Sequence, residues 1–122
     1  MTTSNIKQMF CNITGADPAD TRWTQLITNG EQLVRARLSV DESSLGTAEN
    51  ACCEFAAAAS ASYEYACIMA DKETPVMSEN GAVSIRRSFP QLIADMKKLR
   101  DSAFEVISAA GLTGGGFAFK AV

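Results

Sequence analysis

The chain has 122 residues, of which 47% are hydrophobic and 20% charged, with a formal net charge of −3 and a sequence pI of about 4.9. This length predicts one domain, residues 1–122, with a buried core. The acidic balance argues against binding to a nucleic-acid backbone, which requires clustered lysine and arginine. The longest nearly apolar run, residues 55–61, is much shorter than the roughly 20 residues of a membrane span, and the N-terminus lacks the pattern of a signal peptide. We therefore expect a cytoplasmic protein whose four cysteines are reduced.

Two helices are predicted in the first third of the chain. The first begins at a cap on Ser4 and covers residues 4–11, and Gly15 ends this region. Asp17 and Pro18 then have the pattern of a helix start, an acidic cap followed by proline at the first helical position. The second helix is therefore predicted to begin there and to run to about residue 38.

The second predicted helix has an apolar stripe, in which Trp23 is expected to anchor the core. Gly30 lies in this stripe, although glycine disfavours a helix by about 1 kcal/mol relative to alanine. Its expected use is therefore close contact with another helix. The remaining members, at helical spacing, are Leu26, Ile27, Val34 and Leu38.

An acidic loop at residues 39–46 precedes an alanine-rich helix predicted over residues 47–72, with Thr47 as its cap. Neither side of this helix is cleanly polar. A helix that is apolar on nearly all sides is central in a fold or covered by other chains. One face is expected to pack closely, because most of its side chains are small: Ala48, Ala51, Cys52, Phe55, Ala59, Ser62, Ala66 and Met69.

The next segment predicts a β-hairpin followed by a further helix. Asn80-Gly81 is the strongest short hairpin signal, because both positions tolerate positive φ, and it places the hairpin over residues 76–86. The last helix is predicted over residues 88–110, with Gly111 as its stop. Its expected apolar stripe consists of Phe89, Leu92, Ile93, Met96, Ala103 and Ile107.

Residues 112–122 are predicted to form a C-terminal arm. Phe117 and Phe119 share one side of the chain if the arm is an extended strand. Three arrangements remain open for them: docking on this domain's core, addition to the hairpin, or contact with a neighbouring subunit. The predicted fold class is thus mainly α, a small bundle of three to four helices with a β-hairpin and an extended C-terminal strand.

The residues that usually carry catalysis or bind metals are scarce. The chain has no histidine, which removes the most common general base and zinc ligand. Cys11, Cys52, Cys53 and Cys67 lack paired C-x-x-C spacing, so we interpret them as small apolar residues. We therefore predict no catalytic residues, no metal site and no cofactor, and a protein that is not an enzyme.

The candidate partner interface consists of Arg86, Arg87, Phe117 and Phe119. The arginine pair is expected to form the polar rim of a protein interface or a solvated edge, and exposed phenylalanines beside smooth alanine faces are typical of interfaces. A monomer whose tail covers its own core explains these features equally well.

The order of features resembles small proteins encoded in prophages of gut Firmicutes, and the layout is similar to the helical head–tail connector (adaptor) proteins of long-tailed phages. A helix ends in EQLVRARL at residues 31–38 and is followed by the acidic loop and the alanine-rich helix. GAVSI at residues 81–85, another helix and GGFAF at residues 115–119 complete the order.

This resemblance implies a structural role, with the portal and tail-completion proteins of a phage as partners and a homo-oligomeric ring beneath the portal as a possible assembly. The hairpin and the tail would be the arms that reach a neighbour. No specific nucleic acid and no membrane are implied, and the protein would occupy the host cytoplasm during assembly and then the virion neck. The alternative is a small helical regulatory or adaptor module that binds one protein partner.

Overall fold

A computed structural model describes residues 1–72 and 89–113, and these residues form four α-helices and one short 3₁₀ helix. Within these two ranges the only β pairing is an isolated antiparallel bridge between Leu38 and Thr113. The predicted mainly α bundle is confirmed. Its elements are α1 (Thr3–Thr14), α2 (Thr24–Arg37), η1 (Glu42–Ser44), α3 (Thr47–Lys72) and α4 (Phe89–Ala109).

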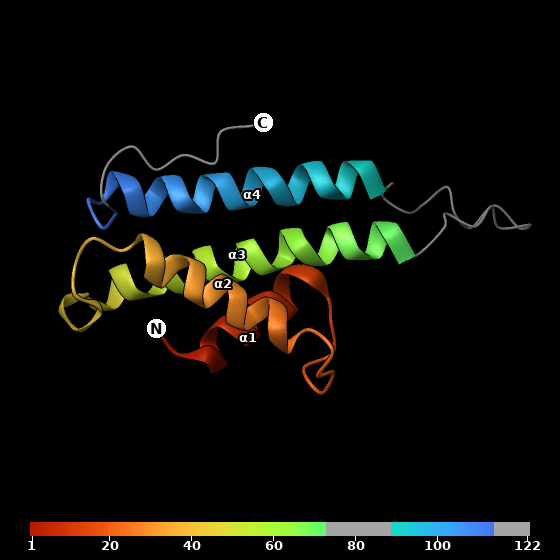
Figure 1. The fold of residues 1–122 in the computed structure, drawn as a ribbon, viewed down its shortest axis with the longest axis horizontal. Helices are drawn as coiled ribbons and strands as arrows, with labels where there is room; N and C mark the ends of the chain where they lie inside the picture. The colour runs from red at the N-terminus through yellow and green to blue at the C-terminus, as the bar shows by residue number, and fades with distance from the viewer. Residues whose placement is uncertain (73–88, 114–122) are drawn as a thin grey trace, which may run out of the picture.

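The long helix α3 lies at the centre of the bundle (Figure 1). Helices α1 and α2 pack against one side of it, and α4 runs antiparallel along the other side. No helix in the described part of the chain is both long enough and apolar enough to cross a membrane. The predicted hairpin at residues 76–86 and the predicted strand containing Phe117 and Phe119 lie outside the described residues.

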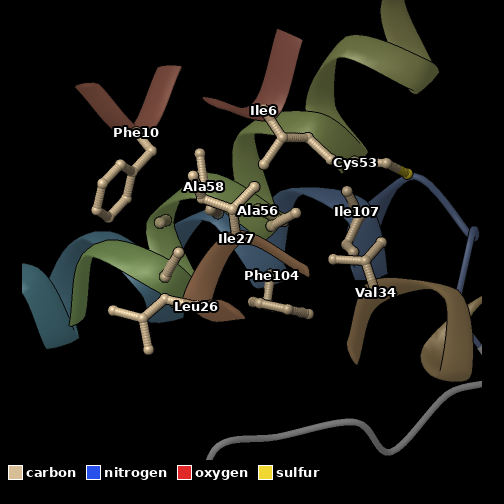
Figure 2. Packing of buried hydrophobic residues seen from close by; sticks show 14 of the residues in the cluster. Ile6, Phe10, Leu26, Ile27, Val34, Cys53, Ala56, Ala58, Phe104 and Ile107 are labelled. Carbon is tan, nitrogen blue, oxygen red and sulfur yellow. The ribbon is translucent and has the colours of Figure 1, made fainter. Parts of the chain in front are cut away.

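The middle of α3 is buried on every side. Residues 56–59, all alanine, have no exposed surface, and Ala61 and Ser62 are equally buried. Larger side chains from the other helices gather around these small residues, among them Ile6, Phe10, Val34, Phe104 and Ile107 (Figure 2). Of the two alternatives that the sequence left open, the central position in the fold is therefore the one that this helix has.

The predicted packing face of α3 is only partly correct. Ala59, Ser62 and Ala66 are buried as expected, but Ala48 and Ala51 are exposed. The remaining members of that face, Cys52, Phe55 and Met69, are half-buried. Burial follows the position along the helix more than the side of the helix, because three other helices surround its middle and leave its first turns uncovered.

Gly30 of α2 permits the close crossing of α2 and α3. A Cβ atom added at Gly30 would lie 2.3 Å from the backbone oxygen of Ala57, a separation that non-bonded atoms do not adopt. The predicted stripe around it is also buried, with Leu26, Ile27 and Val34 in the core. The predicted use of Gly30 is therefore confirmed.

The predicted start of the second helix is wrong, because α2 begins at Thr24. The side chain of Asp17 accepts a hydrogen bond from the backbone N–H of Ala19 at 2.9 Å, and that of Asp20 accepts one from the N–H of Arg22 at 3.0 Å. Aspartate side chains stabilise turns by the same bonds with which they cap helices. Two consecutive turns therefore replace the predicted helix over residues 18–23.

The C-terminal ends of α1 and α4 lie at the glycines that the sequence predicted. Gly15 and Gly111 both adopt positive φ of 77°, as expected for glycines that end a helix. After α4, Gly111 N–H donates to the carbonyl oxygen of Ser108 and Leu112 N–H to that of Ile107, the paired bonds of a Schellman motif.

The helix starts differ from the predicted caps by one or two residues. Thr2 caps α1 in place of Ser4, and its side chain accepts from the N–H of Asn5. At α3 the helix begins at Thr47, and the side chain of Glu49 accepts from the N–H of Gly46 at 2.9 Å. Gly46 therefore holds the cap position that was predicted for Thr47.

Candidate functional site

The residues predicted to form a partner interface, Arg86, Arg87, Phe117 and Phe119, all lie outside the described residues. Within residues 1–72 and 89–113, no group of three or more histidine, cysteine, aspartate or glutamate side chains is placed to hold a metal ion. The features that remain are a polar network at the N-terminal segment, an aromatic cluster, a tyrosine–arginine contact and the outer face of α4.

Glu54 connects α3 to the start of α1. It is only 3% exposed, and its carboxylate accepts hydrogen bonds from the backbone N–H of Thr2 at 2.8 Å and from the side-chain amide of Asn5 at 3.2 and 3.3 Å. Because Thr2 caps α1, the carboxylate of Glu54 lies at the positive end of the α1 dipole, where negative charge is favoured. Glu54 therefore caps α1 from another helix, which is a structural role.

We expect Glu54→Gln to lower the free energy of unfolding by about 1–2 kcal/mol. The amide keeps the shape of the side chain but loses the charge that strengthens these bonds and favours the helix dipole. Urea unfolding followed by circular dichroism measures the change. Glu64→Gln, on the same helix and half-buried, is the matched control, and an equal loss in both variants would contradict the capping role.

A second set of charges connects α2 with the loop that contains η1. The Arg35 guanidinium forms an ion pair with Glu31 on its own helix and donates to Glu42 Oε1 at 2.8 Å. Glu42 Oε2 lies 2.7 Å from the amino group of Met1, which also donates to Asn50 Oδ1 at 2.7 Å. Glu42 thus joins the loop, α2 and the N-terminal segment.

These contacts favour the charged forms of the groups. The hydrogen bond from Arg35, followed by that from the Met1 amine, lowers the pKa of Glu42 from 4.5 to about 2. The hydrogen bond to Glu42 in turn raises the pKa of Arg35. Thr3 adds a further link, since its hydroxyl donates to Glu31 Oε1 at 2.7 Å.

Stability is therefore expected to depend on pH through Glu42. Because folding lowers the pKa of this group, its contribution is fully present above pH 4.5 and is lost as the pH falls to about 2. The pair is partly exposed, so the contribution is about 1 kcal/mol or less and decreases at high salt. Other carboxylates titrate in the same window, and the measurement is therefore the difference in unfolding free energy between wild type and Glu42→Gln at pH 6 and pH 3. A difference that is unchanged by pH would contradict this prediction.

An aromatic cluster packs the C-terminal end of α1 against α3. The ring of Tyr65 meets Phe10 edge-on at 5.7 Å between centroids and Trp23 at 4.8 Å. Trp23 is 7% exposed, so its predicted role as a core anchor is confirmed. On its outer side, Arg22 lies over the Trp23 ring at 5.0 Å and pairs with Asp20 at 2.7 Å.

Tyr63 connects α3 to α4. Its ring lies under the Arg100 guanidinium, 4.5 Å from the ring centroid, a cation–π contact. The hydrogen bond with Cys67, together with that residue's charge and with burial, raises the pKa of the Tyr63 hydroxyl. This contact packs α3 against α4.

The cysteines have the environment of structural residues. All four are free, and Cys53 has no exposed surface. Burial raises the pKa of the Cys53 thiol to about 11, so it is neutral at physiological pH. Cys11, Cys52 and Cys67 are half-buried.

Sequence reasoning missed the buried carboxylates Glu31 and Glu54. A signal was present for Glu54, since one acid interrupts a run of small apolar residues in the centre of a helix. Such a charge must be hydrogen-bonded when it is buried. The identity of its partners could not be predicted, because Thr2 lies 52 positions away in the chain.

The outer face of α4 carries the most exposed large hydrophobic side chain of the described residues, Val106, at 53% exposure. Ala94, Lys98, Glu105 and Ala109 are exposed on the same helix. Its inner face, with Ala103, Phe104 and Ile107, is buried.

In comparisons with protein-family models, with curated proteins and with solved structures, nothing matches this chain.

Proposed function

We propose that this chain is a structural protein of a tailed phage or prophage that acts at the head–tail junction, by protein–protein assembly and without catalysis. The observation that supports this proposal is the order of features along the chain. A helix ending in EQLVRARL, an acidic loop, the alanine-rich α3 and the later α4 follow one another in an order that resembles that of helical head–tail connectors.

In this proposal the helical bundle is a rigid body and the assembly contacts come from its arms. Helices packed around small side chains approach closely and resist deformation. The predicted hairpin at residues 76–86, the interface residues Arg86 and Arg87, and the tail with Phe117 and Phe119 would contact a neighbouring subunit, the portal or a tail-completion protein. The protein would then occupy the virion neck after assembly in the host cytoplasm.

The first test is the sequence of the DNA that flanks the gene. We expect portal and capsid genes on one side and tail genes on the other. Metabolic or regulatory neighbours would contradict the head–tail proposal and favour a helical module that binds one protein partner.

The second test uses the portal protein from the same gene neighbourhood. We expect the full chain to bind purified portal complexes, and deletion of residues 114–122 to abolish binding while circular dichroism retains the helical signal. Phe117→Ser with Phe119→Ser should reproduce the loss, and Lys120→Ser is the matched control in the same arm. If the deletion instead unfolds the helices, the tail belongs to the core and cannot be the assembly arm.

A further inference from the structure

Within the described residues, helix α4 is covered on one side only. Its inner face packs on α3, and the opposite face is turned away from the other described helices (Figure 1). At about 100° per residue, Lys98 and Glu105 lie within about 20° of each other at the centre of that opposite face. We define the outer stripe of α4 as Ala94, Lys98, Asp101, Ser102, Glu105 and Ala109, which are exposed except for the half-buried Asp101.

Two charges in the outer stripe have no partner within the described residues. Neither Lys98 nor Glu105 forms an ion pair or a hydrogen bond there. They are two helical turns apart, about 10 Å along the axis, and cannot pair with each other in one chain. Asp101 differs, because Arg100 donates to its carboxylate at 3.1 Å.

The outer stripe is self-complementary when two copies of α4 run antiparallel. With a two-fold axis between Asp101 and Ser102, Lys98 of each copy lies opposite Glu105 of the other. Ala94 then lies opposite Ala109, while Asp101 lies at the edge of the stripe and keeps its pair with Arg100. Small side chains at both ends permit close approach, and the contact is isologous, so every favourable pair occurs twice.

We propose that the outer stripe of α4 is a self-association surface on which a second copy of this chain docks antiparallel, through two symmetric ion pairs between Lys98 and Glu105. Val106 flanks the stripe, and docking would remove part of its exposed surface from water. A single pair of helices buries less than the roughly 1,000 Å² of a stable interface, so the dimer is weak and transient. It is also sensitive to salt, because exposed ion pairs are screened.

Charge exchange tests this proposal by sedimentation velocity over a wide range of protein concentration. We expect the wild-type chain to dimerise as concentration rises, and Lys98→Glu and Glu105→Lys each to weaken dimerisation by about tenfold or more, because both symmetric pairs become repulsive. An equimolar mixture of the two variants should restore the dimer as a heterodimer, since each new charge then faces its opposite.

Lys97→Glu is the matched control, because it changes the net charge equally from a position about 100° away on the helix. Circular dichroism verifies that each variant is folded. The proposal is overturned if the wild type stays monomeric, if Lys97→Glu weakens association as much as Lys98→Glu, or if the mixture fails to restore the dimer. Larger rings that are indifferent to these charges would also overturn it, while leaving the head–tail proposal intact.

Discussion

Replacing Gly30 by alanine is expected to destabilise the protein, although alanine is the better helix former. Helix propensity alone would increase the free energy of unfolding by about 1 kcal/mol. The new Cβ atom, however, would lie 2.3 Å from the backbone oxygen of Ala57, and a backbone atom cannot rotate away as the end of a side chain can. Helix α2 must therefore move away from α3, which opens contacts in the core. Overpacking of this kind costs typically 1–3 kcal/mol or more, so we expect a net loss of about 1–2 kcal/mol.

Urea unfolding of Gly30→Ala followed by circular dichroism measures this loss. Gly46→Ala is the control, because the nearest atom to a Cβ there is the flexible side-chain oxygen of Glu49 at 3.6 Å. We expect a change below about 1 kcal/mol for the control. Helix propensity predicts that Gly30→Ala raises the free energy of unfolding, and overpacking predicts that it lowers it. A gain in stability would therefore show that α2 and α3 are not in close contact.

Phe104→Ala is expected to have the largest effect of any single truncation considered for this chain. Phe104 is 1% exposed and belongs to the core cluster between α4 and the other helices (Figure 2). Removing a buried phenylalanine costs about 3–5 kcal/mol, because the ring's transfer free energy is lost and a cavity remains in the core. Domains of this kind are stable by about 5–15 kcal/mol in total, so the variant would be marginally folded.

Val106→Ala is the matched control for Phe104→Ala, since it lies two residues further along the same helix and is 53% exposed. We expect its unfolding free energy to change by about 0.5 kcal/mol or less. Thermal unfolding of both variants is the measurement. Similar losses in the two variants would contradict the burial of Phe104 in the core.

Gly30→Ala and Phe104→Ala change contacts that hold the helical bundle together. Neither residue belongs to the proposed assembly surfaces. A destabilised variant that still binds the portal would separate folding from assembly. Conversely, the charge variants on the outer stripe of α4 are expected to leave unfolding unchanged, because Lys98 and Glu105 have no partner within the described part of one chain.

The sequence by itself determined the helices whose signals are local. Repeats of apolar residues at helical spacing and strong alanine propensity predicted α3 over its full length, residues 47–72, and glycines at positive φ ended α1 and α4 at Gly15 and Gly111. The contact of Gly30 with a small-residue helix was also predictable, because glycine in an apolar stripe has few other uses. Periodicity alone missed Phe104, which lies at the edge of the predicted stripe and is nonetheless buried.

Only the tertiary structure decided features whose partners are distant in the chain or whose local signals have two solutions. Asp17 and Pro18 suit a helix start and a turn equally, because aspartate can bond to the same backbone groups in both, and here the chain forms turns. Burial of Glu54 depends on Thr2 and Asn5, and burial of Glu31 on Thr3, 28 positions away. No local pattern encodes such pairs, since packing of α1 against α2 and α3 is what brings donor and acceptor together and excludes water from them.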